Sequence, residues 1–198
     1  MAIRHSIAVA VALFSGAACA AGADPIAAAN NALSYSAGWR NTAGSSNAAL
    51  NLSASTQTGP LYSAAAATYS FGHTLDFDVK IGNAVAVGNV AQITPYLGYE
   101  HHRWESVTYN AIGAGLLAQY EAMPGVTIGA DGFIGRTFSA STNDGSDTAL
   151  SPSYAAAVGV SLDYAIVPHV HLTASYRFER FIAKENTQTA MLGVAYAY

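Results

Sequence analysis

The feature that most constrains this chain is a strict alternation of apolar and polar side chains over segments about as long as one membrane crossing by a strand. The segment 170–179 shows it most clearly. One face would carry Val170, Leu172, Ala174, Tyr176 and Phe178, and the other His171, Thr173, Ser175, Arg177 and Glu179. A helix would mix these two sets around its circumference, whereas a strand separates them. The segment therefore predicts a β-strand with one apolar and one polar face.

The same alternation recurs along most of the chain. It is clear in 154–166, 75–82, 110–120 and 190–198, and weaker in 33–40, 50–56, 61–71 and 93–104. The segment 126–138 begins in phase and departs from it near Gly132-Phe133, where we expect a β-bulge. Repeated half-apolar strands of this length indicate an antiparallel β-structure.

Composition indicates what lies outside these strands. Charged residues make up 10% of the chain and apolar residues 52%, whereas a soluble domain carries roughly 25% charged residues. A soluble sandwich or lipocalin-like barrel would present Lys, Glu and Thr where this chain presents Val, Leu, Ala and Tyr. A formal net charge of -4 with eight Lys plus Arg argues against a nucleic-acid partner. From residue 24 onward, no apolar run is long enough for a transmembrane helix. A closed β-barrel is then the remaining way for this part of the chain to span a bilayer.

Residues 1–23 are typical of a secretory signal peptide. Arg4 and His5 precede a short apolar core, and a run of small residues follows it. The alternatives are an uncleaved anchor helix, for which the core is too short, and a lipoprotein attached at Cys19. We expect Cys19 to leave with the signal, and 24–198 to form a single barrel domain.

The number of strands is ten or eight. Ten follow if 32–41 and 47–57 are strands, and 33–40 alternates clearly enough to favour ten. Thr58-Gly59-Pro60 would then be a periplasmic turn and Gly72-His73 a tight external one. Short periplasmic turns and a longer polar stretch at 141–152 place both termini on the periplasmic side.

Outward aromatic residues are expected near both ends of the barrel: Tyr120, Tyr164, Tyr196 and Tyr198 at the periplasmic end, and Trp39, Tyr99, Trp104 and Phe178 at the external end.

The chain resembles the small Gram-negative outer-membrane barrels of the porin-like, opacity and outer membrane protein A type. The resemblance rests on the signal peptide, the alternating segments, the segment 93–99 and the ending Val194-Ala195-Tyr196-Ala197-Tyr198. It implies that Val194, Tyr196 and Tyr198 form the signal read by the barrel-assembly machinery, although relatives more often end in Phe. It also implies an exported, outer-membrane protein that meets periplasmic chaperones during biogenesis, and outer-membrane lipid and lipopolysaccharide afterwards. We expect a monomer.

Charged side chains on the predicted strands fall mainly on the inward set. Because buried charges need partners, we expect a polar network in the lumen. Its members are Asp76, Asp78, Lys80, Glu100, Asp163, Arg177 and Glu179. The alternative is that Asp76 and Asp78 act as an acid–base pair at the external rim. Ten-stranded outer-membrane proteases combine such a pair with an Asp-His pair, and this chain has no Asp-x-His motif.

The histidines and one loop carry weaker hypotheses. His101 and His102 should point to opposite faces of their strand. They belong to a cluster at the external rim, 101–105, which we expect to contact lipid headgroups. His169 and His171 share one face but have no third ligand in the sequence, so no metal site is expected. Residues 143–147 resemble part of a calcium loop without its final Glu, and an external loop is expected there. No cofactor and no catalytic residue is predicted.

These observations favour a non-enzymatic barrel with a structural or surface-interaction role. The alternatives are a narrow porin-like channel for ions or small solutes and, third, a rim-located lipid- or peptide-modifying enzyme. A continuous water-filled path would favour the channel. Arg177 packed against Glu100 or Glu179 across the lumen would argue against it.

Overall fold

A computed structural model describes residues 25–42, 44–104, 107–142, 154–182 and 185–198. The expected signal peptide, Cys19 and the loop 143–147 lie outside these ranges, as does the side chain of Trp104. Within the described ranges, no helix is both long enough and apolar enough to cross a membrane.

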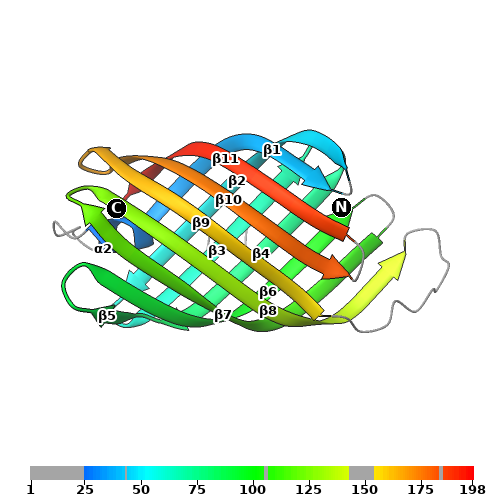
Figure 1. Ribbon diagram of the computed structural model, residues 1–198, viewed down its shortest axis with the longest axis horizontal. Helices are drawn as coiled ribbons and strands as arrows, with labels where there is room; N and C mark the ends of the chain where they lie inside the picture. Colours follow the sequence, from blue (N-terminus) through cyan, green and yellow to red (C-terminus); the bar gives the residue numbers. More distant parts are fainter. Residues whose placement is uncertain (1–24, 43, 105–106, 143–153, 183–184) are drawn as a thin grey trace.

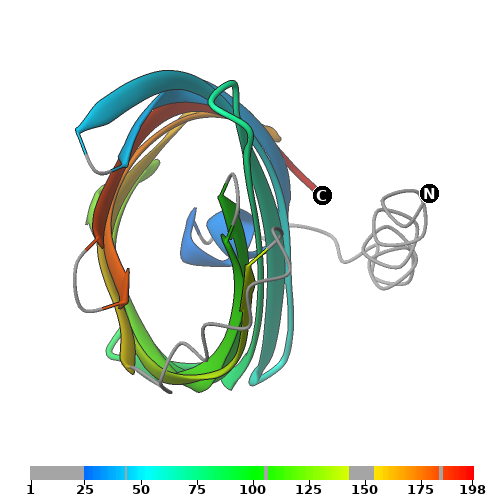
Figure 2. The ribbon, with the colours of Figure 1, turned by 90° about the vertical axis from the view of Figure 1, so that its right-hand side faces the viewer.

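Ten antiparallel strands close into a barrel (Figure 1 and Figure 2). They are β1 (Ala32–Thr42), β2 (Ser45–Thr58), β3 (Leu61–Ser70), β4 (Thr74–Asn83), β6 (Ala91–Trp104), β7 (Val107–Met123), β8 (Val126–Thr142), β9 (Tyr154–Val167), β10 (Val170–Ile182) and β11 (Glu185–Ala197). Each pairs with its neighbours in the chain, β1 pairs with β11, and β4 pairs with β6 to close the ring. The short strand β5 (Val85–Val87) pairs with the beginning of β6 and lies outside the ring. The prediction of a ten-stranded barrel is confirmed.

The two ends of the barrel are distinguished by the chain termini. β1 begins and β11 ends at the end that also holds the helix α2 (Pro25–Asn30), at the left of Figure 1. We call this the terminal end and the opposite one the distal end. Tight turns at the terminal end use Gly59 (φ 57°), Gly125 (φ 79°) and His169 (φ 71°). Positive φ values are sterically easy for glycine and uncommon for other residues.

The outer surface of the barrel is apolar. Leu97 is 69% exposed, Leu192 65% and Val158 60%. Several exposed aromatic side chains lie where outward belts were expected: Trp39, Tyr120, Tyr164 and Tyr196. Tyr198 differs, because it is only partly exposed and its hydroxyl donates a hydrogen bond to the Ser55 carbonyl at 2.8 Å. A surface of this kind suits lipid as its solvent.

Strand β8 corrects one expectation. Its pairing with β9 runs without interruption from Val126 opposite Tyr164 to Arg136 opposite Tyr154. Gly132 faces outward and Phe133, which is 4% exposed, faces inward in phase with the rest of the strand. The bulge expected at Gly132-Phe133 is therefore wrong, since the apparent slip is a large aromatic ring placed inside the lumen.

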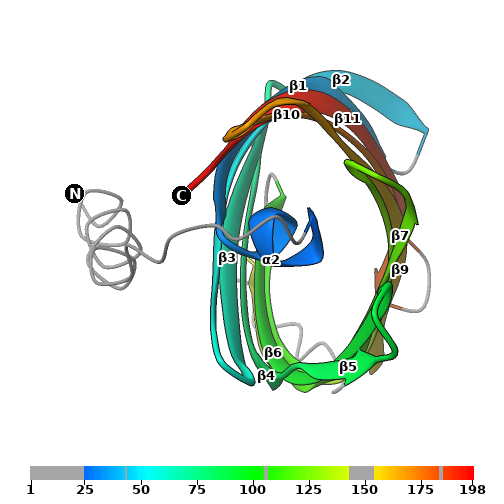
Figure 3. The same cartoon turned by 90° about the vertical axis from the view of Figure 1, so that its left-hand side faces the viewer.

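Helix α2 lies inside the barrel at its terminal end (Figure 3). It contacts β2, β7 and β8, and it buries Ile26 (5% exposed) and Asn30 (1%). The sequence analysis did not predict it. A six-residue helix is too short to be stable alone in water, so its contacts with the lumen wall must stabilise it.

Candidate functional site in the barrel lumen

Charged side chains meet across the distal half of the lumen in an arrangement that we call the charged layer. It comprises Arg40, Asp76, Asp78, Lys80, Glu100, His102, Asp131, Arg177 and Glu179. Strand alternation places all of them on inward-facing positions. Its members lie on β1, β4, β6, β8 and β10, and β4 and β10 each carry both cationic and anionic side chains.

Arg40 on β1 is 2% exposed and lies nearest the distal end of this layer. Its guanidinium forms an ion pair with Asp76 on β4 and a second, at 3.4 Å, with Oε2 of Glu179 on β10. His102 on β6 completes the group: its Nδ1 contacts Asp76 and lies 3.3 Å from Arg40 Nη2. The imidazole also stacks on Tyr109, with ring centroids 4.7 Å apart. One cation thus joins strands on three sides of the lumen.

Arg177 on β10 is the second centre of the layer. Its Nη2 donates to Glu100 Oε1 at 2.5 Å, its Nε donates to Glu179 Oε1 at 2.5 Å, and its Nη1 donates to Asp131 Oδ2 at 3.4 Å. Glu100 lies on β6, four strands away from β10 around a ring of ten. The contact therefore crosses the lumen instead of following the wall.

Lys80 extends the layer toward the middle of the barrel. Its Nζ lies 2.6 Å from Asp131 Oδ2 and 4.9 Å from the centre of the Tyr96 ring. The Tyr96 hydroxyl donates to Asp131 Oδ1 at 2.7 Å. Asp131 therefore accepts from a lysine, an arginine and a tyrosine, which satisfies its charge in a site away from bulk water.

Aromatic rings fill the lumen beside these charges. Tyr96, Tyr109 and Phe133 form a buried cluster with small alanines of β7 and β9. Inward glycines make room for the rings: a Cβ on Gly115 would lie 2.2 Å from Tyr96 Cζ, and one on Gly135 would lie 2.7 Å from Phe133 Cζ. Glycine on the inner wall thus determines where a large ring can lie.

Neutral amides close around α2 at the terminal end. We call Asn30, Gln57, Gln92 and Gln119, together with α2, the amide plug. Asn30 Nδ2 donates to Gln57 Oε1 at 2.8 Å and to Gln119 Oε1 at 3.0 Å, and Gln119 Nε2 returns a bond to Asn30 Oδ1 at 2.8 Å. Gln92 Nε2 donates to Gln57 Oε1 at 3.0 Å. These four side chains come from α2, β2, β6 and β7 and so span this part of the lumen.

Asn31 anchors the plug to the wall. Its Oδ1 accepts from the Gln57 backbone N–H at 2.8 Å and from Thr56 Oγ1 at 3.2 Å. Its backbone carbonyl accepts from the Tyr198 N–H at 3.0 Å. The Ser55 hydroxyl donates to the Ala29 carbonyl at 3.3 Å. The plug is thereby tied to β2 and to the C-terminal residue Tyr198.

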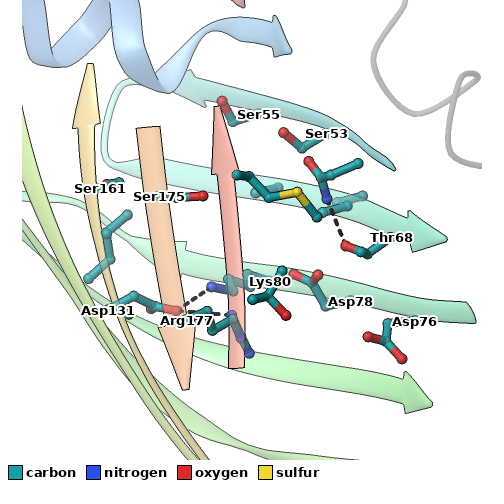
Figure 4. A pocket seen from close by; sticks show the side chains of 18 of the residues that line it. Ser53, Ser55, Thr68, Asp76, Asp78, Lys80, Asp131, Ser161, Ser175 and Arg177 are labelled. Atoms are coloured by element: carbon teal, nitrogen blue, oxygen red, sulfur yellow. Dashed lines mark hydrogen bonds and ion pairs between the residues drawn. The ribbon is translucent and has the colours of Figure 1, made fainter. Parts of the chain in front are cut away.

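A cavity of about 310 Å³ lies alongside the charged layer: six members of that layer line it, and it reaches Ser55, whose hydroxyl bonds to α2. Figure 4 shows hydroxyl groups at one side of it and charged side chains at the other. Its labelled lining residues are Ser53, Ser55, Thr68, Asp76, Asp78, Lys80, Asp131, Ser161, Ser175 and Arg177. Space for several water molecules exists here, bounded on the distal side by ion pairs.

Two of the predicted network residues lie apart from its ion pairs. Asp163 Oδ1 lies 2.5 Å from His171 Nδ1 on the neighbouring strand β10, away from the charged layer. Asp78 lines the cavity beside Lys80 and forms no direct ion pair with another residue of the described ranges. The others, Asp76, Lys80, Glu100, Arg177 and Glu179, all make the ion pairs described above.

The histidines need one correction. His102 was expected at a lipid-facing rim, but it is 3% exposed and turns into the lumen, because inward and outward positions alternate and Glu100 is inward. His101 does face outward, and its Nδ1 lies 2.8 Å from Asn110 Oδ1. His169 lies in a turn, with Nδ1 2.9 Å from the Ala197 carbonyl oxygen. Among the described residues, no group of three or more His, Cys, Asp or Glu could hold a metal ion.

Sequence reasoning missed three parts of the site. Arg40 was not among the predicted members of the network, although it pairs with Asp76. The Asp76–His102 contact was missed because it arises from the register of β4 with β6, which places these two residues directly opposite each other. The amide plug was missed because neutral Asn and Gln carry little positional information.

Comparisons with known proteins give structural likeness only. No family model matches the chain, and no curated protein sequence does. A bacterial polysaccharide outer membrane secretin is similar to it with a TM-score of 0.50 and 7% identity over 80% of this chain and 57% of that one. A KdgM porin in complex with disordered oligogalacturonate has a TM-score of 0.45 and 11% identity, covering 84% of this chain and 99% of that one. Neisserial surface protein A has a TM-score of 0.43 and 16% identity, covering 84% and 96%.

At such identities the likeness concerns the fold and not the activity. The structure itself is a closed antiparallel barrel of ten strands with an apolar outer wall. This architecture, with the likeness to the secretin, shows that the chain has the fold of an outer-membrane β-barrel protein.

Proposed function

We propose that this protein is an integral barrel of the Gram-negative outer membrane whose own side chains close its lumen. Its role is structural or surface-interacting, and neither transport nor catalysis is its activity. Residues 1–23 would export it, and Val194, Tyr196 and Tyr198 would direct its assembly.

The apolar exterior supports membrane insertion. The outward face carries aliphatic and aromatic side chains along most of its height, including Leu97, Ile134 and Leu192, each more than 60% exposed. Exposing such a face to water would cost about 25 cal/mol for each Å² of apolar surface, whereas lipid removes that cost. In the hydrocarbon region, ring closure also pairs backbone groups that an open sheet edge would leave unsatisfied.

The observation that carries the proposal is the set of ion pairs across the lumen. Arg177 joins Glu100, Asp131 and Glu179, and Arg40 joins Asp76 and Glu179. A permeating ion would have to separate these pairs or pass through a path that their side chains already occupy. Side chains are expected to fill a barrel of this strand number or to leave only a thin path.

The amide plug supports closure of the lumen at a second place, the terminal end. Asn30 is 1% exposed, and Gln92 and Gln119 are 8% and 9% exposed, so little room for water remains around them. The rim enzyme is disfavoured because Asp76 lies inside the lumen, where its carboxylate forms an ion pair with the buried Arg40.

A narrow channel is the second candidate. The cavity of about 310 Å³ favours it, as does the excess of acid in the charged layer, where five carboxylates face three cationic groups, leaving two net negative charges. Such a lumen would favour cations over anions.

Planar-bilayer recordings of the purified, refolded chain separate the two candidates. A closed barrel predicts no stepwise current at any applied voltage, with heat-modifiable migration in gels as the control for correct folding. Stable current steps with a reversal potential that shows cation preference would contradict the proposal and establish the channel.

A further inference from the structure

One carboxylate of the charged layer lacks the cationic partner that the others have. The other four each form an ion pair with an arginine or with Lys80. Asp78 forms none within the described part of the chain, and no dashed line reaches it in Figure 4. Lys80, two positions along the same strand, is held instead by Asp131 at 2.6 Å and by the ring of Tyr96. An ionised carboxylate inside the lumen therefore remains without a countercharge of its own.

The neighbours of Asp78 on the adjoining strands increase its need for a cation. Directly opposite it lie Ala66 on β3 and Glu100 on β6. Ala66 offers only a methyl group. Glu100 is a second carboxylate, 5% exposed, whose Oε1 is bound by Arg177 and whose Oε2 has no hydrogen-bond partner among the described residues. Because like charges directly opposite each other destabilise a sheet, a cation bound at Asp78 would stabilise this part of the wall.

The cavity of about 310 Å³ provides space for such a cation beside Asp78. Its lining has two more anionic than cationic side chains: Asp76, Asp78, Asp131 and Glu179 against Lys80 and Arg177. One water takes up about 30 Å³ in the liquid, so the cavity has room for a molecule of several atoms. A divalent metal is disfavoured, because no group of three or more His, Cys, Asp or Glu in the described ranges could hold one.

Hydroxyl groups without a protein partner line the same cavity. Tyr62 on β3 is 6% exposed, and its hydroxyl forms no hydrogen bond with any residue that the structure describes. Ser161 on β9 and Ser175 on β10 lie directly opposite each other, and their hydroxyls likewise have no partner among the described residues. Each of these groups can both donate and accept a hydrogen bond. The cavity thus combines one charged acceptor with several hydroxyls from other strands.

We propose that this cavity binds a small organic ammonium ion that also carries hydroxyl groups, that is, a protonated amino alcohol. Its ammonium group donates to Asp78 in a charge-assisted hydrogen bond that replaces the missing ion pair. Its hydroxyl groups exchange hydrogen bonds with Tyr62 and with the two serines. A lumen that is closed to ion flow then still serves as a binding site.

The ligand enters from the terminal end, past α2. The cavity reaches Ser55, whose hydroxyl donates to the Ala29 carbonyl of α2. The bonds that hold α2 are neutral hydrogen bonds, whereas buried ion pairs bound the cavity on its distal side. Neutral hydrogen bonds cost less to break than buried ion pairs, so displacing α2 is the easier way in.

The test is titration calorimetry of three-carbon probes with the purified, refolded full chain in uncharged detergent micelles at neutral pH. The probes are aminopropanediol, which has both kinds of group, propylamine, which lacks the hydroxyls, and glycerol, which lacks the ammonium group. Excess KCl is present throughout, so that K⁺ would occupy a site for monatomic cations. We expect saturable binding of one aminopropanediol per chain, with a Kd about tenfold or more below that of either other probe.

Three results of this titration would overturn the proposal. Absence of saturable binding would show that the cavity holds only water or K⁺. Equal affinity for glycerol would show that Asp78 does not select an ammonium group. Equal affinity for propylamine would show that the hydroxyl groups of the cavity do not recognise the ligand.

Asp78→Asn tests the charged contact. It keeps the size of the side chain and removes its charge, so it should raise the Kd for aminopropanediol about tenfold or more. The matched control is Asp163→Asn, which removes an inward carboxylate that pairs with His171 and does not line the cavity. We expect an unchanged Kd for this control. An equal loss in both variants would mean that bulk charge attracts the probe, and would overturn the site.

Tyr62→Phe tests the hydroxyl contact. It should raise the Kd for aminopropanediol about threefold and leave that for propylamine unchanged, whereas the same change for both probes would contradict the contact. If Asp78→Asn misfolds, as judged by heat-modifiable migration in gels, Ala66→Leu replaces it. This variant fills the cavity opposite Asp78 without altering charge: loss of binding supports the proposal, and wild-type affinity overturns it.

The outcomes also separate this site from the proposed function. A chain that conducts ions in planar bilayers and still binds aminopropanediol contradicts only closure of the lumen. A chain that does not conduct and does not bind the probe contradicts only the cavity site.

Discussion

The two polar layers that we propose to close the lumen, the charged layer and the amide plug, are built from different chemistry. The charged layer uses buried ions whose partners come from several strands, with Arg40 at 2% exposure. The amide plug uses neutral side chains, with bonds of 2.8–3.4 Å around Asn30 and Gln119. Removing one partner of a buried ion pair leaves an uncompensated charge, whereas removing one amide leaves only an unsatisfied dipole. The charged layer should therefore fix the barrel's shape, while the plug can be opened at small cost.

The largest effect is expected for Arg40→Ala. It leaves Asp76 and Glu179 without a shared cation in a site away from water, so we expect a loss of about 3–5 kcal/mol in the free energy of unfolding. Urea titration in detergent micelles, followed by tryptophan fluorescence, measures it. Arg103→Ala is the matched control, because its side chain is exposed on the outer wall and its removal should change stability by less than about 0.5 kcal/mol. A loss below 1 kcal/mol for Arg40→Ala would show that the layer does not fix the fold.

An intermediate effect is expected from coupling between Arg177 and Glu100. Their charges meet at 2.5 Å, so replacing both with apolar residues should cost less than the sum of the two single changes. We expect a coupling energy of about 1–3 kcal/mol in the cycle of Arg177→Met and Glu100→Leu. Strict additivity would mean that the two side chains do not interact across the lumen in the folded protein.

The smallest effect on stability is expected at the plug. Asn30→Ala removes hydrogen bonds to Gln57 and Gln119 without exposing a charge, so we expect a loss of about 1–2 kcal/mol. Faster amide hydrogen exchange should be confined to 25–31 and the neighbouring ends of β2 and β7. A loss as large as that of Arg40→Ala would remove the distinction between the two closures.

The barrel itself could be predicted from the sequence because a strand's period of two is visible without tertiary context. The alternation in 33–40 was sufficient to favour ten strands over eight. Phe133 shows where this reasoning fails: an aromatic residue on the inner set was interpreted as a break in the pattern. Glycines at 98, 115 and 135 were the available signal, because they occupy the inner wall where the rings of Tyr96 and Phe133 lie.

The pairing of charges could be predicted only in part. Alternation places Arg40, Asp76 and Glu179 inside, but which of them meet depends on strand tilt and ring closure, which no local pattern contains. His102 and Arg40 are separated by 62 positions in the chain and meet across the lumen. Helix α2 also depends on long-range contacts, those with β2, β7 and β8, so its short Ala-rich sequence gave no independent signal.

The central claim is that the charged layer and the amide plug close the lumen in series. The single-channel conductance of four proteins tests it most directly. They are the wild type, a chain lacking residues 25–30, the double variant Arg177→Ser/Glu100→Ser, and the combination of both changes. We predict no current steps from the wild type. We predict little current from the chain lacking 25–30 or from Arg177→Ser/Glu100→Ser alone, and stable cation-preferring steps from the combination. The claim would be contradicted by current steps from the wild type, or by steps as large as those of the combination from either change alone.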